Sequence, residues 1–268
     1  SSGNNRKVNA DKMIMNRLAG LPHGQIDDIP SQLGLRGDVL IEYAQWLKSR
    51  IIELGGTQYR PVIHLDVHGA IGKIFHRDAE EMALYLSELE NQLTPFQLRM
   101  ESVVLGESRE ETIQLLLELR EKLQLKNSKV QLVADEWANT LEDMNEFARH
   151  RACHMIHLKM PDLGGIDQTI EAVLKLKNQG VLTLLGGSCI ETDLSARTSV
   201  HVALATQPTA LLAKPGMGID EAIQCMRNEM NRALIFVWSL VSQRASEDSV
   251  ETGMLQKVGD DSVLGLLA

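Results

Sequence analysis

The sequence has few cysteines, few aromatic residues and no long apolar run, and each shortage excludes a class of protein. The three cysteines among 268 residues, Cys153, Cys189 and Cys225, are far apart and odd in number. This spacing argues against a disulfide framework and favours a reducing compartment. No apolar run approaches the roughly 18 residues that a membrane-spanning helix needs, and the first residues do not form a signal-peptide pattern. We therefore expect a cytoplasmic protein without a membrane partner.

An excess of basic residues is also missing. The chain carries 27 Lys and Arg against 36 Asp and Glu, which gives a formal net charge of −9. Because such a surface repels phosphate backbones, we expect no nucleic-acid partner. Hydrophobic residues make up 44% and charged residues 24% of the chain, as in ordinary globular proteins. The length fits one (β/α)8 barrel, which needs about 250 residues.

Short strand-like runs alternate with longer helical patterns along the chain. The strand candidates are 13–18, which is the weakest, and 61–66, 96–101, 130–135, 155–159, 181–185 and 210–214. The helix candidates, whose apolar residues recur at a period near 3.6, are 38–54, 78–93, 109–125, 140–152, 166–178, 193–205 and 220–241. This alternation indicates parallel β/α units. We predict a flexible segment at 1–10, one barrel domain at 11–242 and a poorly ordered tail at 243–268.

Charged side chains stand at the carboxyl ends of four consecutive strand candidates. They are Asp66, Glu101, Asp135 and Lys159, each separated from the next by about one β/α unit. The carboxyl ends of barrel strands meet at one mouth, where active sites form, so this pattern favours a TIM-type barrel over a doubly wound sheet. Taken alone, each acid is more often a helix cap or a surface ion pair, and the lysine a solvated charge. The prediction rests on the four residues together.

Three carboxylates at one mouth require protonation or a cation. Two like charges about 4 Å apart repel by roughly 4 kcal/mol at an effective dielectric constant of 20. Oxygen ligands without thiolate favour a hard ion, with Mg²⁺ as the first choice. A nearby cation and partial burial would lower the pKa of Lys159 toward neutrality and make it a base. The pattern therefore indicates metal-assisted proton abstraction next to a carboxylate.

Three further residues near this mouth leave alternatives open. His64 and His68 flank Asp66 on the same face of a strand, which suggests extra metal ligands, although packing or surface roles are commoner. Lys214 ends another strand candidate. It fits either a structural ion pair with one of the carboxylates or a place in the site.

Nine motifs resemble those of the methylaspartate ammonia-lyase family, which is part of the enolase superfamily. They are DKMIM at 11–15, LPHG at 21–24, HLDVHGAIG at 64–72, LRME at 98–101, VADEW at 133–137, KMPDLGG at 159–165, GGSCIETD at 186–193, AKPGMGIDE at 213–221 and NEMNRAL at 228–234. The resemblance runs from about residue 7 to about residue 242. Enolase-superfamily sites that pair a Lys or His base with Mg²⁺ are a worked example of this chemistry.

The resemblance implies an activity, its cofactors and eight site residues. Family members convert threo-3-methylaspartate, an amino acid, reversibly to mesaconate and ammonia in the breakdown of glutamate, by removing the C3 proton and stabilising the enediolate. They use Mg²⁺, with a monovalent cation such as K⁺ as activator, and they are homodimers. By resemblance, Asp66, Glu101 and Asp135 bind the metal, Lys159 and His23 are the catalytic bases, and His157, Ser188 and Cys189 contact the substrate.

The sequence departs from the family pattern at the position of His157, where the family has a glutamine that holds the substrate. Histidine has a different reach and titrates near neutrality, which leaves open another enolase-type reaction, such as dehydration or racemisation of a related carboxylate. The family's N-terminal capping domain does not precede the barrel in this sequence. Closure of such a domain strengthens the electrostatics of a site and orients the substrate, so we keep a second alternative, a lidless chain or fragment that is weakly active or non-catalytic.

Overall fold

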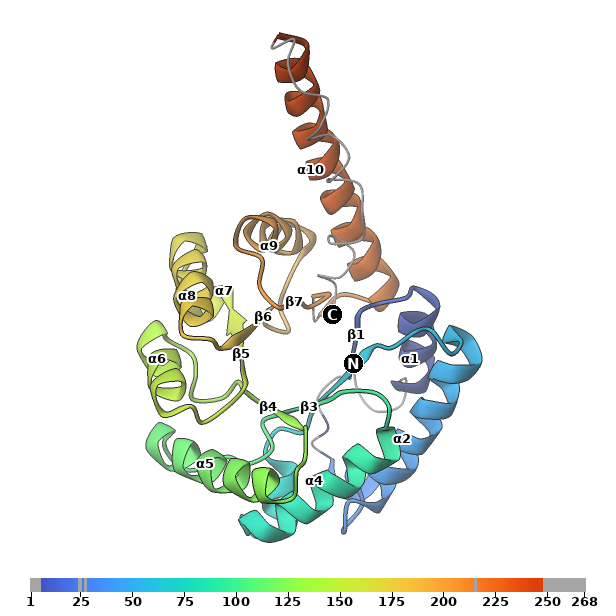
Figure 1. The fold of residues 1–268 in the computed structure, drawn as a ribbon, viewed down its shortest axis with the longest axis vertical. Coiled ribbons are helices and arrows are strands. Elements are labelled where there is room, and N and C mark those ends of the chain that lie inside the picture. Colours follow the sequence, from blue (N-terminus) through green and yellow to red (C-terminus); the bar gives the residue numbers. More distant parts are fainter. Residues whose placement is uncertain (1–5, 24–25, 27, 215, 248–268) are drawn as a thin grey trace.

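The strands lie around the centre of the molecule and the helices surround them (Figure 1). The structure is a computed structural model that describes residues 6–23, 26, 28–214 and 216–247. Seven strands form one sheet: β1 (Gly20–His23), β2 (Val62–Asp66), β3 (Leu98–Glu101), β4 (Gln131–Ala134), β5 (Met155–Lys159), β6 (Leu182–Gly186) and β7 (Ala210–Leu211). Every neighbouring pair is parallel and the spatial order follows the chain. A doubly wound sheet would reverse its order at a switch point, so the barrel prediction is confirmed.

Helices connect the strands on the outside of the sheet. They are α1 (Arg6–Met15), η2 (Ile29–Leu33), α2 (Asp38–Arg50), η3 (Ile51–Gly55), α3 (Ala70–Ile74), α4 (Ala79–Leu93), α5 (Arg109–Leu125), α6 (Leu141–His150), α7 (Met160–Leu163), α8 (Ile166–Asn178), α9 (Asp193–Thr206) and α10 (Ile219–Glu247). Several begin at the residue types that cap helices well. The Asp78 carboxylate accepts a hydrogen bond from the Glu81 amide, and Thr140 forms a capping box with Asp143.

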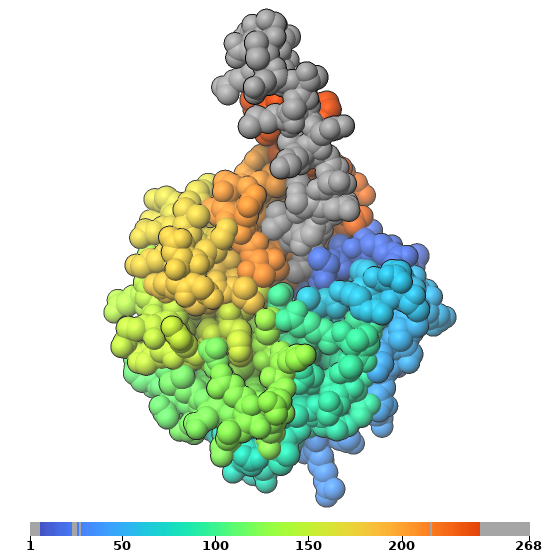
Figure 2. Space-filling view, in the orientation of Figure 1, coloured from blue at the N-terminus to red at the C-terminus, as the bar shows by residue number. Residues whose placement is uncertain are grey.

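The core lies between the sheet and the inner faces of the helices. In β3, Leu98 and Met100 are buried, and on α4 Leu86, Leu89 and Leu93 form a fully buried stripe. That spacing of three and four residues is the one that places side chains on one face of a helix. The described part of the barrel forms a rounded body (Figure 2).

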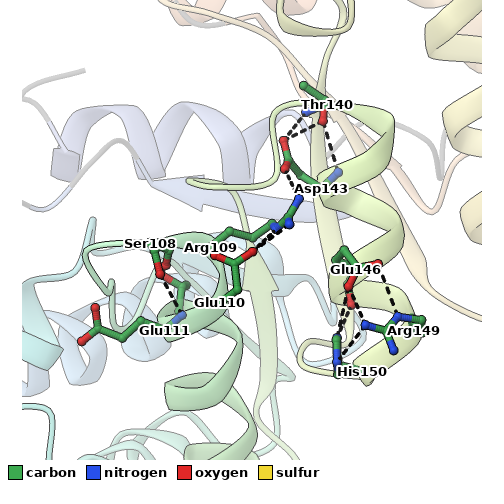
Figure 3. A network of polar contacts seen from close by, with 10 residues as sticks. Ser108, Arg109, Glu110, Glu111, Thr140, Asp143, Glu146, Arg149 and His150 are labelled. Carbon is green, nitrogen blue, oxygen red and sulfur yellow. Dashed lines mark hydrogen bonds and ion pairs between the residues drawn. The ribbon is translucent and has the colours of Figure 1, made fainter.

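Neighbouring helices are also joined at the surface by polar side chains. The Arg109 guanidinium at the start of α5 donates to the Asp143 carboxylate of α6 at 2.8 Å (Figure 3). Within α6, the guanidinium of Arg149 contacts the Glu146 carboxylate at 2.6 Å. Pairs near the surface each contribute little to stability, so the buried core determines the fold.

The strand prediction at 13–18 is wrong, because Met13 and Ile14 belong to helix α1. They share a buried face with Ala10, and this spacing is helical rather than alternating. The first strand is β1 instead. Its sequence, GLPH, contains glycine and proline and no β-branched residue, so it lacks the composition that marks a strand.

Both ends of the barrel domain extend beyond the predicted boundaries. Residues 6–10, predicted as flexible, form the first turns of α1, where Arg6 stacks over the Tyr43 ring and Lys7 over the Trp46 ring. At the other end, α10 continues to Glu247, past the predicted boundary at 242. Residues 1–5 and 248–268 lie outside the described residues. None of the helices in the described ranges combines the length and apolar character that crossing a bilayer requires.

Candidate metal and proton-transfer site

The four predicted residues at the strand ends meet at one end of the barrel. Asp66 and Glu101 end β2 and β3 and are paired in the parallel register. Asp135 directly follows β4, and Lys159 ends β5. Glu101 is 3% exposed and Asp135 6% exposed. Consecutive β/α units thus bring three carboxyl groups and one amine into a largely buried volume.

Glu101 is held between two histidines. Its Oε2 lies 2.6 Å from Nε2 of His64, and its Oε1 lies 2.8 Å from Nδ1 of His157. Burial would raise the pKa of Glu101, but the charges and hydrogen bonds of His157 and His64 outweigh it and hold the pKa well below its usual range. Glu101 is therefore an anionic carboxylate.

Asp135 forms an ion pair with Lys159. The two carboxylate oxygens lie 2.6 and 2.8 Å from the lysine Nζ. Burial disfavours the charged amine, yet the charge and hydrogen bond of Asp135 outweigh it, so the pKa of Lys159 is raised. Burial also raises the pKa of Asp135, partly opposed by the nearby His157 charge. The lowered lysine pKa was expected beside a bound cation, and for the metal-bound site it stays a prediction.

Asp66 lies beside these groups, where burial and nearby negative charges disfavour its charged form. Burial and the charges of Glu101 and Glu136 raise its pKa to about 8, and its Oδ1 accepts a hydrogen bond of 3.1 Å from the backbone amide of His68. A carboxyl group with so high a pKa is one that a bound cation would stabilise in its charged form. The donor set therefore fits a divalent ion.

The tightest cluster of ligand atoms differs from the predicted one. Among the described residues, Glu101, Asp135 and His157 each offer one atom such that all three lie within 4.8 Å of one another. The predicted set had Asp66 as the third member and His157 as a substrate contact. The strand pairing nonetheless keeps Asp66 next to Glu101, so the predicted ligands remain neighbours.

The remaining predicted residues lie at the same end of the barrel. His23 is the last residue of β1, opposite Leu65 in the register, and its side chain lies outside the described residues. Ser188 and Cys189 follow β6. Within the described structure the Ser188 hydroxyl is buried without a hydrogen-bond partner, while Cys189 is exposed. A buried hydroxyl without a partner is suited to a ligand's oxygen or nitrogen.

Glu136 is a polar residue of this site that the sequence reasoning missed. Its carboxylate accepts hydrogen bonds from Nδ1 of His68, at 2.7 Å, and from the hydroxyl of Ser102. It therefore joins the loops that follow β2, β3 and β4. The sequence signals that could have indicated it are its position directly after Asp135 and its place in the VADEW motif at 133–137. His68 thus contacts the Glu136 carboxylate, and His64 contacts the Glu101 carboxylate. Both contacts differ from the metal-ligand roles considered for these two histidines.

Lys214 is 1% exposed, and its Nζ donates to the carbonyl oxygen of Gly186. The ion pair with a metal carboxylate, one of the two alternatives, is therefore not the contact it makes. Burial lowers its pKa from 10.5 to about 8, although Glu191 opposes the change.

This lowered pKa predicts a pH dependence of stability. Between pH 8 and 10.5 the unfolded chain binds more protons at this position than the folded one, so the free energy of unfolding increases with pH, by up to about 1.4 kcal/mol per unit. Urea unfolding at pH 8, 9 and 10 should show wild type gaining stability relative to Lys214→Met. Parallel pH profiles of the two proteins would contradict the assignment.

Comparisons with known proteins agree with the geometry. A family model described as "Methylaspartate ammonia-lyase C-terminus" matches residues 1–238. Methylaspartate ammonia-lyase 2 of Carboxydothermus hydrogenoformans is 49% identical over 233 residues, which are 87% of this chain and 56% of that protein. The chain thus spans a little over half the length of the curated relatives it matches.

Solved structures of similar proteins share the fold. A crystal structure of the Citrobacter amalonaticus methylaspartate ammonia-lyase containing (2S,3S)-3-methylaspartic acid is 41% identical, with a TM-score of 0.85 over 88% of this chain and 58% of that one. A structure of the Clostridium tetanomorphum β-methylaspartase, described as a Mg complex, is 40% identical, with a TM-score of 0.84 over 91% and 58%. The barrel architecture is therefore that of these enzymes' corresponding part.

Proposed function

We propose, since the chain belongs to the methylaspartate ammonia-lyase family, that it provides the catalytic barrel for reversible elimination of ammonia from threo-3-methylaspartate to give mesaconate. The observation that carries the proposal is the position of the Lys159 amine, 2.6 Å from Asp135 and beside the buried Glu101 carboxylate. A base next to a set of acidic metal ligands is the arrangement needed to remove a proton adjacent to a carboxylate.

Mg²⁺ is the proposed cofactor, and the acids described above would hold it. Asp66, Glu101 and Asp135 supply oxygen ligands, which Mg²⁺ prefers. When bound, the ion would supply positive charge to the substrate carboxylate next to C3 and would compete with Lys159 for the Asp135 oxygens. The described Mg complex of the Clostridium tetanomorphum relative supports this choice. A K⁺ activator remains a prediction by resemblance.

Each of four residues would then have its own role in the elimination of ammonia. The Lys159 amine takes the C3 proton, the C3 electron pair forms the C2–C3 double bond, and ammonia leaves from C2 with the electrons of the C–N bond. The Ser188 hydroxyl, buried without a partner in the described structure, is placed to hold a substrate oxygen, with the neighbouring Cys189. His23 is proposed as the opposing base for the other C3 epimer, and its position at the end of β1 puts it on the same mouth.

Two alternatives have specific observations in their favour. Another enolase-type reaction is favoured by His157, which stands where the family has a substrate-holding glutamine and whose Nδ1 lies 2.8 Å from Oε1 of Glu101. A weakly active or non-catalytic barrel is favoured by the ion pair between Lys159 and Asp135, which engages the amine that would take the proton. A small-molecule amino acid as substrate and a cytoplasmic location remain predictions.

The direct test is turnover by the full chain with Mg²⁺ and threo-3-methylaspartate. The ultraviolet absorbance of the unsaturated diacid and the released ammonia should rise together. A screen of amino acids and hydroxy acids in the same buffer separates the alternatives. Turnover of a different carboxylate alone would replace the lyase assignment, and a chain that binds the metal without turning over any substrate would leave only the non-catalytic alternative.

A homodimer is the proposed assembly, and the outer half of α10 is the proposed contact. The helix projects away from the barrel (Figure 1) and exposes six large apolar side chains. These are Ile235, Phe236, Val237, Trp238, Leu240 and Val241. They surround the helix rather than forming one stripe, which is typical of a helix that is covered. Two copies of this surface would bury on the order of 1,000 Å², close to the roughly 1,200 Å² at the lower bound for specific interfaces.

The variant Phe236→Glu with Trp238→Glu should therefore shift the protein from dimer to monomer, as measured by light scattering after size-exclusion chromatography. Two charges in the centre of an apolar contact would lose their hydration on association and find no partner of opposite charge. Leu84→Glu, on an exposed apolar position of α4, is the matched control and should remain dimeric. A double variant that is still dimeric would place the interface elsewhere.

A further inference from the structure

His157 lies on β5 with one ring nitrogen directed at both buried carboxylates. Its Nδ1 is 2.8 Å from Oε1 of Glu101 and 3.8 Å from Oδ2 of Asp135, and the residue is 6% exposed. In the described structure its other nitrogen, Nε2, is buried without a hydrogen-bond partner. All the polar contacts of this side chain are therefore made by Nδ1, toward the two acids.

The ring is fixed in this position by its neighbour on β6. A Cβ atom added at Gly186 would lie 1.7 Å from Nε2 of His157, so only glycine leaves room for the imidazole there. The position of Gly186 opposite Lys159 in the sheet register keeps this contact at the mouth of the barrel. A ring that is buried and packed against backbone holds its Nδ1 in a fixed position toward the two carboxylates.

The spacing of the three groups suits a metal ion. An ion bonded to two ligands at about 2.0–2.2 Å holds the donor atoms roughly 3–4 Å apart. The donor atoms of Glu101, Asp135 and His157 lie within 4.8 Å of one another, so small side-chain movements bring them to that distance. One nitrogen and two carboxylates form a mixed donor set, in contrast to the all-oxygen set that Mg²⁺ prefers.

We propose that His157 is a direct metal ligand through Nδ1, which gives up its proton to solvent when the ion binds, together with Glu101 and Asp135, and that the imidazole raises the affinity of the site for Mn²⁺, Co²⁺ and Zn²⁺ relative to its affinity for Mg²⁺. The inference rests on the proposed function only in placing a divalent ion at this mouth. Imidazole raises affinity for these ions much more than for Mg²⁺, because Mg²⁺ retains water and oxygen ligands. His157 would then act on the metal rather than on the substrate.

Electron spin-echo spectroscopy of Mn²⁺ bound to the full chain tests the ligand directly. Wild type should show the nitrogen coupling of a directly bound imidazole, and His157→Gln should lose it. His64→Gln is the matched control, because His64 contacts the same Glu101 carboxylate from its other oxygen and should leave the coupling in place. A wild-type spectrum without a directly bound nitrogen would overturn the proposal, whether or not the variants fold.

Competition titration measures the preference. In His157→Gln the ratio of Mn²⁺ to Mg²⁺ affinity should fall by roughly 10- to 100-fold, with Mg²⁺ affinity nearly unchanged. An unchanged ratio would contradict the ligand role. The lyase proposal can fail separately. Nitrogen coupling without turnover of methylaspartate would remove that function alone. Turnover of methylaspartate without nitrogen coupling would remove this inference alone.

Discussion

Replacement of Lys159 by methionine is expected to lower kcat for methylaspartate by roughly 10²- to 10⁴-fold, the usual contribution of a positioned base. Methionine fills a similar volume but cannot accept a proton. Because the proton transfer is lost in the transition state, kcat and kcat/KM should fall together. The measurement is the initial rate of mesaconate formation with the metal ion saturating.

Two controls separate loss of the base from loss of structure. Lys175→Met, on an exposed position of α8, should retain the wild-type rate. The Lys159 variant should retain the wild-type far-ultraviolet circular dichroism. Since its Asp135 carboxylate no longer pairs with the lysine amine, the variant should bind the divalent ion at least as tightly as wild type. A wild-type rate in Lys159→Met would assign the proton transfer to another group.

Glu101→Gln is expected to weaken binding of Mg²⁺ and Mn²⁺ by about 100-fold or more, since metal affinity varies over orders of magnitude with the charge and number of ligands. The change preserves shape and removes one negative charge from a residue that is 3% exposed. Calorimetric titration of each ion into both proteins measures the effect.

The amide can still accept a hydrogen bond from one of the two histidines, so a stable fold is expected and should be verified by thermal unfolding. Glu121→Gln, on the exposed face of α5, is the charge-matched control and should bind the ions as wild type does. Metal affinity unchanged by Glu101→Gln would show that the ion is bound elsewhere.

The barrel and its mouth could be predicted from the sequence because the strand ends carry charges that a core would not tolerate. Asp66, Glu101, Asp135 and Lys159 follow runs of apolar residues, and in parallel β/α units such positions share one edge. The start and end residues of α5 and α8 were predicted to the residue, since Ser108 and Gly165 precede clear helical periods. The first strand was missed because its four residues carry no periodic signal.

The contacts between the charged groups could not be predicted from the sequence, because they depend on distances across four strands. The resemblance placed His157 against the substrate, whereas its ring contacts Glu101 and approaches Asp135. The ion pair between Lys159 and Asp135 was also not predicted. Partial burial alone lowers a lysine pKa, but the Asp135 carboxylate at 2.6 Å outweighs it, and only coordinates give that distance.

A Mn²⁺-soaked crystal with anomalous scattering measured at the manganese edge tests most directly whether these strand ends form a metal site. The ion should lie about 2.0–2.4 Å from a carboxylate oxygen of both Glu101 and Asp135, at the carboxyl ends of β3 and β4. An anomalous peak at any other place on the chain, or full Mn²⁺ binding in solution with no peak at this mouth, would contradict the account.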